Sequence, residues 1–162
     1  MTIDLSNNFT NQPLVLQTNH TLRSAYEAMD GDSQSEIPFL VWLLENPDSP
    51  LSLPGKIYLY KHDYLHILLE RGFSLYDEAF IIGFTMGNDL NTKWLHVYLF
   101  KLISSIFYPK KYRFSEKHFQ EFNLGFMYGK EVQTKNINSI DFQAYEYKKI
   151  SEIREKLGMN IY

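Results

Sequence analysis

Two histidines and an aspartate lie close together in the segment His62-Asp63-Tyr64-Leu65-His66. Each residue of an α-helix advances by about 100°, so His66 would lie about 40° and Asp63 about 100° from His62. Their side chains would therefore point into one arc of a helix. Two imidazoles and a carboxylate arranged in this way are suited to a divalent metal ion, with zinc, iron and magnesium as candidates. The alternative is a pair of histidines that are solvated or hydrogen-bonded in the core.

A carboxylate further along the chain, Glu78, is the fourth candidate ligand. Gly72 marks the turn of a predicted helical hairpin, and His66 and Glu78 each lie six residues from it. In a hairpin of antiparallel helices about 8 to 10 Å apart, these two side chains would face one another. The predicted metal ligands are His62, Asp63, His66 and Glu78. Glu70 and Asp77 are candidates for hydrogen bonds that orient the ligands.

The apolar periodicity of the chain predicts an all-α fold, a compact bundle of six to seven helices with the metal site on an αα-hairpin. The first hairpin helix covers Lys56 to Arg71, and the second follows the capping box of Ser74 and Asp77 and ends at Gly87-Asn88. No stretch alternates apolar and polar residues as a half-buried strand would. The other predicted helices run from Thr21 to Gly31, from Glu36 to Glu45, from Thr92 to Phe107, from Ser115 past Phe126, and from Tyr147 to Gly158.

Length and composition indicate one helical domain over residues 1–162, with an irregular segment at 1–18. The net charge of -3 argues against nucleic acid as a partner. Because the chain has no cysteine, a metal must bind to His, Asp or Glu, and a reducing compartment fits. The N-terminus matches no targeting signal, and the apolar stretches are shorter than the roughly 20 residues of a membrane span. We therefore expect a cytoplasmic location.

The spacing His-Asp-x-x-His, followed by eleven residues and Glu, resembles the signature of the coenzyme Q biosynthesis protein 4 family. The segments Thr21 to Met29 and Ile153 to Met159 are similar to the first helix and the closing segment of that family. The resemblance implies a helical, metal-binding protein of ubiquinone or another prenylquinone biosynthesis, in a bacterial member. It also implies membrane lipid and a biosynthetic complex as partners, and links the chain to decarboxylation and hydroxylation at C1 of the prenylated ring.

The same resemblance implies a polyprenyl lipid or prenyl phosphate as ligand, with its head group near Asp63 and Glu78. Aromatic residues are abundant, with twelve Tyr and twelve Phe, and they form either an apolar groove for the lipid or an ordinary core. The candidate lining residues are Phe39, Trp42, Phe80, Phe84, Met86, Trp94 and Tyr98. The stretch Tyr108 to Phe114 mixes aromatics with three cations and is a candidate contact with an anionic membrane. A homodimer through apolar helix faces is a further candidate.

Two alternatives to a biosynthetic enzyme stay open. The first is a non-catalytic scaffold that presents a prenylated lipid, which would use the same site. The second is a metal-dependent (phospho)hydrolase. A zinc peptidase would carry His-Glu-x-x-His, whereas Asp63 stands at the position of that Glu. A phosphohydrolase with a His-Asp pair would need a further upstream His and a downstream Asp, for which His20 and Asp89 are the candidates.

Overall fold

A computed structural model of the chain describes residues 19–29 and 39–159, and within them the fold is helical with no sheet. The α-helices are α1 (Leu22–Glu27), α2 (Phe39–Glu45), α3 (Leu59–Leu68), α4 (Leu75–Asn88), α5 (Trp94–Ile106), α6 (Glu116–Glu131) and α7 (Ile150–Leu157). Short 3₁₀ helices cover Lys110–Tyr112, Ile137–Ser139 and Phe142–Tyr145. The predicted all-α fold is thus confirmed. The expected irregular segment at 1–18 and the predicted helix positions at Gly31 and 36–38 lie outside the described residues.

Several helix ends follow the predicted capping residues. Ser74 and Asp77 form the expected capping box at the start of α4, and Ser115 is the N-cap of α6. Gly158 ends α7 in the left-handed conformation, with φ of 72°. The predicted cap at Thr92 is wrong by one residue, because α5 begins after Lys93, whose backbone N–H donates to Nδ1 of His96 at 3.1 Å.

The first hairpin helix is shorter than the sequence predicts. It begins at Leu59 rather than Lys56 and ends at Leu68, and Glu70 then takes a left-handed φ of 52°. The guanidinium of Arg154, on α7, donates to the carbonyl oxygens of Leu68 at 2.8 Å and of Ile67 at 3.1 Å. The bond to Leu68 satisfies a carbonyl group that a helix end leaves without a partner, and the bond to Ile67 adds to the one from the backbone N–H of Glu70. A residue far along the chain therefore helps to end α3.

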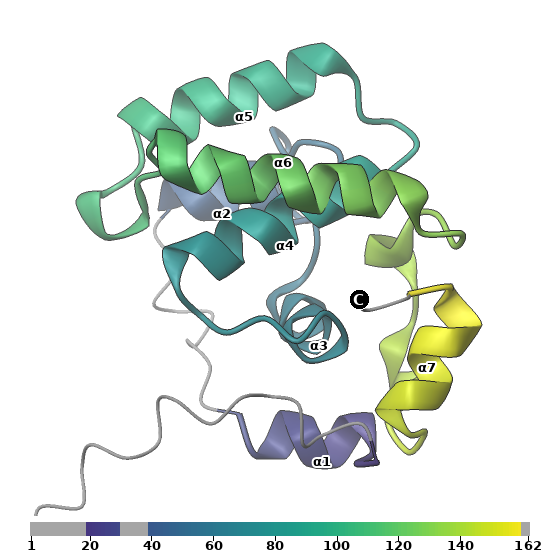
Figure 1. Ribbon diagram of the computed structural model, residues 1–162. Coiled ribbons are helices and arrows are strands. Elements are labelled where there is room, and N and C mark those ends of the chain that lie inside the picture. Colours follow the sequence, from purple (N-terminus) through teal and green to yellow (C-terminus); the bar gives the residue numbers. More distant parts are fainter. Residues whose placement is uncertain (1–18, 30–38, 160–162) are drawn as a thin grey trace, which may run out of the picture.

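Helices α4 and α6 lie against each other over most of their lengths (Figure 1). The close approach is made by glycines one turn apart, namely Gly83 and Gly87 on α4 and Gly125 and Gly129 on α6. A Cβ on Gly83 would overlap the carbonyl oxygen of Phe122, and one on Gly125 would overlap that of Phe80. Only glycine allows the two backbones to approach so closely. This packing fixes α4, which carries Glu78.

Helix α3 lies between α4 on one side and α1 and α7 on the other, and it is seen end-on in Figure 1. Its Leu65, Ile67 and Leu68 are buried in a cluster with residues of α1 and α7 such as Leu22 and Ile153. A second cluster, around Phe100 and Phe122, joins α2, α4, α5 and α6. No helix in the described part of the chain is long and apolar enough to cross a bilayer.

Candidate metal centre and cavity

Three of the four predicted ligands meet where α3 and α4 are joined. Nε2 of His62 lies 3.4 Å from Oε2 of Glu78, and Nε2 of His66 lies 3.3 Å from Oε1 of the same carboxylate. One donor atom of each residue lies within 4.8 Å of the others, so these three residues could hold a metal ion. The two imidazole rings are 4.6 Å apart and nearly perpendicular. We call His62, His66 and Glu78 the donor triad.

The hairpin brings the donor triad together although its helices cross instead of running antiparallel (Figure 1). His66 lies in the last turn of α3 and Glu78 in the first turn of α4. Both are therefore close to the connecting turn, where two helices stay near each other at any crossing angle. The prediction from equal distances to Gly72 that His66 meets Glu78 is confirmed, whereas the predicted antiparallel packing of the two helices is wrong.

The donor triad fits a divalent metal ion. Donors bound at about 2.0–2.1 Å around a tetrahedral ion are roughly 3.4 Å apart, which matches the separations of 3.3 and 3.4 Å between the imidazoles and Glu78. His66 is fully buried, and neither of its ring nitrogens has an aligned hydrogen-bond partner among the described residues. Such a group normally has a partner, because a buried polar atom without one is destabilising. Nε2 of His66 faces the Glu78 carboxylate at 3.3 Å, and a metal ion between the two would bind both.

The protonation states of His62 and Glu78 suit a bound cation, whereas a metal would compete with a proton at His66. Burial lowers the pKa of His62 to about 4, although Glu78 acts to raise it. Burial likewise acts to lower the pKa of His66, but the carboxylates of Glu78 and Asp63 outweigh it and the pKa is raised. Burial acts to raise the pKa of Glu78, yet the two histidines bring it below its usual value. Near neutral pH the neutral imidazole of His62 and the ionised carboxylate of Glu78 can thus bind a cation, and His66 must release its proton when the metal binds.

The other three acidic candidates occupy different places. Asp63 is buried and lines the adjoining cavity, but the structure does not bring it into the donor triad, and its role as a ligand stays a prediction. Glu70 accepts a hydrogen bond from Arg154 at 2.8 Å, and Asp77 accepts one from the Ser74 hydroxyl at 2.7 Å. Glu70 thus stabilises the end of α3, close to His66, and Asp77 stabilises the start of α4, close to Glu78.

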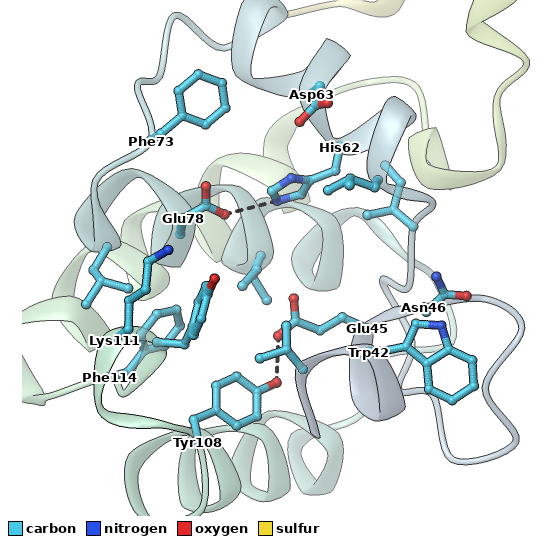
Figure 2. Close-up of a pocket in the computed structure, with 16 residues that line it drawn as sticks. Trp42, Glu45, Asn46, His62, Asp63, Phe73, Glu78, Tyr108, Lys111 and Phe114 are labelled. Carbon is cyan, nitrogen blue, oxygen red and sulfur yellow. Dashed lines mark hydrogen bonds and ion pairs between the residues drawn. The ribbon is translucent and has the colours of Figure 1, made fainter. Parts of the chain in front are cut away.

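A cavity of about 430 Å³ opens beside the donor triad, between α2, α3, α4 and the segment after α5 (Figure 2). Its size is within the usual range of small-molecule sites, roughly 300–1,000 Å³. Most of its wall is apolar and includes Val41, Trp42, Ile57, Phe73, Ile82 and Phe114. His62, Asp63 and Glu78 line the same cavity. His62 and Glu78 are therefore accessible to a ligand that is mainly apolar, while His66 lies buried behind them.

A second polar pair faces the donor triad across the cavity. Figure 2 shows Glu45 and Tyr108 on the wall opposite His62 and Glu78, where the Tyr108 hydroxyl donates to Oε1 of Glu45 at 2.6 Å. Burial raises the pKa of Glu45 to about 8, although the bond from Tyr108 acts to lower it. The side chain of Lys111 extends along the wall toward Glu78. The cavity therefore has two polar ends.

Sequence reasoning missed Glu45, although a signal was present. Glu45 is the one charged residue of the otherwise apolar segment Phe39–Glu45, which the sequence analysis predicts only as part of a helix. An acid on a helix that is apolar all round is usually paired or neutral, and this helix places it beside Tyr108. Lys111 was noticed for a contact with membranes and was not expected to line the cavity.

The lipid-lining candidates are spread over the molecule. Trp42 lines the cavity. Phe84 and Met86 are buried in the two core clusters, and Phe80 is buried under the guanidinium of Arg71, 3.6 Å from its ring centre. Trp94 and Tyr98 do not line this cavity; they are 80% and 57% exposed on α5. Nothing is described of the side chain of Phe39.

The other histidines, together with Asp89, have other roles. His96 accepts from the N-cap of α5, and Nδ1 of His118 accepts from the backbone N–H of Ser115 at 2.9 Å, so both stabilise helix starts. Asp89 accepts from the backbone N–H of Gly55 at 2.8 Å and belongs to no metal-binding group with the donor triad. His20 is exposed, and its carbonyl accepts from the backbone of Ile150.

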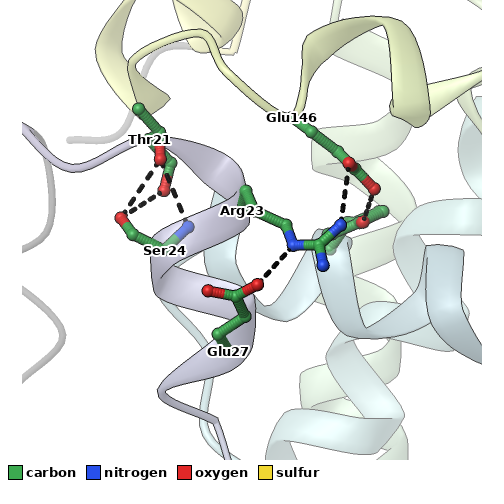
Figure 3. A network of polar contacts seen from close by, with 6 residues as sticks. Thr21, Arg23, Ser24, Glu27 and Glu146 are labelled. Carbon is green, nitrogen blue, oxygen red and sulfur yellow. Dashed lines mark hydrogen bonds and ion pairs between the residues drawn. The ribbon is translucent and has the colours of Figure 1, made fainter.

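A polar network holds α3 against α1 and the segment before α7 (Figure 3). Glu146 accepts hydrogen bonds from the Tyr64 hydroxyl at 2.7 Å and from Arg23 at 3.2 Å. Arg23 also bonds Glu27 at 2.6 Å within α1. Tyr64 lies between His62 and His66 in the sequence. This network, together with Arg154, therefore fixes the position of α3, which carries both histidines.

Neither a protein-family model nor a curated protein sequence matches this chain.

Proposed function

We propose that this protein binds a divalent metal ion at His62, His66 and Glu78 and holds a polyprenyl lipid or prenyl phosphate in the adjoining cavity. The proposal rests on the position of His62 and Glu78, two members of the donor triad, in the wall of a largely apolar cavity. An amphiphile fits these two environments, with its head group at the polar end and its isoprenoid part against the apolar wall.

The donor types favour zinc or iron over magnesium. Two imidazole nitrogens and one carboxylate suit zinc or ferrous iron, whereas magnesium prefers oxygen ligands in an octahedral arrangement. A metal held by three protein ligands keeps positions for a substrate oxygen and, when bound, would supply a Lewis acid at the head group. His66 and Glu78 would keep the ion against the wall, and Lys111 would lie near the charge of a phosphate or carboxylate.

The resemblance to the coenzyme Q biosynthesis protein 4 family supports a place in prenylquinone biosynthesis. The motif His62, Asp63, His66 and Glu78 carries that resemblance, and three of these residues form the donor triad. We propose chemistry at C1 of a prenylated ring, decarboxylation or hydroxylation, as the activity. A scaffold that presents the same lipid to a biosynthetic complex would use the cavity without this chemistry.

Native mass spectrometry of the purified protein tests the lipid part. We expect a co-purifying or added isoprenoid to stay bound to the wild type and to be lost in Val41→Trp, which places an indole in the cavity. Leu124→Trp is the matched control, because Leu124 is 57% exposed on α6 and does not line the cavity. If the wild type retains no isoprenoid from the host or after incubation, the lipid assignment is wrong.

A further inference from the structure

Glu45 is the last residue of α2, and its side chain extends into the cavity. The helix is otherwise apolar, and its Val41 and Trp42 line the same cavity. One carboxyl oxygen of Glu45, Oε1, accepts the hydrogen bond from Tyr108. The other oxygen, Oε2, points into the cavity and is not hydrogen-bonded to any of the described residues that line it (Figure 2). Glu45 therefore has one oxygen that holds its position and one that a ligand can reach.

The backbone and the core hold this pair in place. Tyr108 is 1% exposed, and its ring packs edge-on against that of Phe100, with ring centres 6.3 Å apart. The carbonyl oxygen of Tyr108 accepts from Nε of Arg113 at 3.1 Å. The carbonyl oxygen of Glu45 accepts from the backbone N–H of Ile57 at 3.0 Å. A polar group that is already fixed in this way loses little conformational entropy when it binds a ligand.

A structural role alone does not account for Glu45. The oxygens of a buried carboxyl group normally have hydrogen-bond partners in the protein. Here one of the two faces a space of about 430 Å³ whose wall is mostly apolar. Burial raises the pKa of Glu45 to about 8, so the carboxyl group keeps its proton near neutral pH. Because Oε1 accepts from Tyr108, the proton is on Oε2, where it can be donated to a ligand.

We propose that Glu45, positioned by Tyr108, binds a second oxygen of the ligand, a hydroxyl or carbonyl group, at the end of the cavity that faces the donor triad. The ligand would have its head group at the donor triad, an apolar middle part against the wall, and this oxygen at Glu45. The inference deepens the proposed function and rests on it, since it needs a ligand in the cavity.

This contact distinguishes the two ligand classes of the proposed function. A prenyl phosphate has only hydrocarbon beyond its head group, and a hydrocarbon tail against Glu45 would cover a polar group without bonding it. A prenylated lipid with a second oxygen would form the hydrogen bond instead. Sites built to hydrogen-bond a ligand discriminate strongly against an analogue that lacks the bonding group. The cavity should therefore favour a ligand with oxygen at both ends.

Binding of matched carboxylic acids to the zinc-loaded full chain tests the inference. The probes are octanoate, decanoate and dodecanoate, each compared with its ω-hydroxy acid, so that the carboxylate can bind at the zinc ion and the hydroxyl group at Glu45. At the length that spans the cavity, isothermal titration calorimetry should show the hydroxy acid binding roughly two- to tenfold more tightly than the plain acid. The plain acid controls for contacts with zinc and with the apolar wall.

Variants of the pair show whether Glu45 is the group that binds the hydroxyl. Glu45→Leu should reverse the preference, because the hydroxyl group then loses water without gaining a partner. Glu45→Gln should keep it, since an amide N–H can donate where the protonated carboxyl group does. Tyr108→Phe should lower the preference and leave the affinity for the plain acid unchanged. Glu152→Leu, which removes an acid at an exposed site on α7, should bind both acids as the wild type does.

Two results would overturn the inference and leave the proposed function standing. The first is a wild type that binds the plain acids and shows no preference for the hydroxy acid at any length. The second is a preference that persists in both Glu45→Leu and Tyr108→Phe. If the zinc-loaded wild type binds neither series, the cavity takes no ligand beside the metal, and the inference fails together with the proposed function.

Discussion

The Tyr108 hydroxyl donates a hydrogen bond to Oε1 of Glu45 at 2.6 Å, on the cavity wall that faces His62 and Glu78. Burial raises the pKa of Glu45 to about 8. The carboxyl is therefore largely protonated near neutral pH, which leaves a polar but uncharged group opposite the donor triad. Its raised pKa has a measurable effect on stability.

Glu45 should make the protein less stable as the pH rises from about 4.5 to about 8. In this range the unfolded chain releases the proton of Glu45, whereas the folded protein keeps it. The stability that the protonated carboxyl provides is therefore fully present below pH 4.5 and is lost as the pH rises to the folded pKa of about 8. The loss is at most about 1.4 kcal/mol per pH unit. Urea unfolding of Glu45→Gln should show a smaller decline than the wild type. The control Glu155→Gln, at an exposed site on α7, should show the same decline in stability with pH as the wild type. If Glu45→Gln also shows the wild-type decline, the carboxyl of Glu45 is ionised in the folded protein.

Replacing Gly83 or Gly125 by alanine should destabilise the protein. In an ordinary helix this change is stabilising by about 1 kcal/mol. Here the added Cβ would overlap a backbone carbonyl of the partner helix, so the helices must separate. We expect a loss of about 1–3 kcal/mol or more in the free energy of unfolding, measured by chemical denaturation. Gln120→Ala, on the exposed side of α6, is the control, and a stabilising effect at Gly83 or Gly125 would contradict the close packing.

Arg154→Met should destabilise the protein because the carbonyl of Leu68 loses the donor that the structure gives it and Glu70 loses its ion-pair partner. Buried groups without partners cost about 1–3 kcal/mol each. Lys156→Met, an exposed site on the same helix, should change little. Amide hydrogen exchange near the end of α3 should rise in Arg154→Met and not in Lys156→Met. Equal exchange in both variants would mean that Arg154 does not hold this helix end.

Local rules predicted the helices and much of the site, while long-range contacts decided the rest. The capping box of Ser74 and Asp77 and the stop at Gly158 depend on neighbours in the chain and were predicted correctly. The end of α3 was predicted wrongly, because Arg154, on the distant helix α7, hydrogen-bonds the carbonyl group of Leu68 there. Helical spacing likewise predicted that His62 and His66 lie together, because both are on one helix. It could not show that α2 places Glu45 in the cavity, or that Trp94 and Tyr98 on α5 face solvent, because both depend on how helices pack.

Substitution of Asp63 distinguishes a ligand from a neighbouring charge. Since Asp63 lies outside the donor triad but helps to raise the pKa of His66, Asp63→Asn should keep the metal and lower that pKa in the metal-free protein. Histidine resonances followed by NMR over a pH titration measure this shift. If Asp63→Asn loses metal to the same degree as His66→Ala, Asp63 is a ligand, as the sequence spacing predicts.

The metal content of the purified protein tests the central claim most directly. Inductively coupled plasma mass spectrometry would compare the wild type with His66→Ala and Glu78→Gln, and with His20→Ala as the control at an exposed histidine. We predict one zinc or iron per chain in the wild type and in His20→Ala, and a clear loss in both triad variants. Metal content unchanged in both triad variants, or a wild type that stays metal-free after incubation with zinc and with ferrous iron, would contradict the donor triad as a metal site.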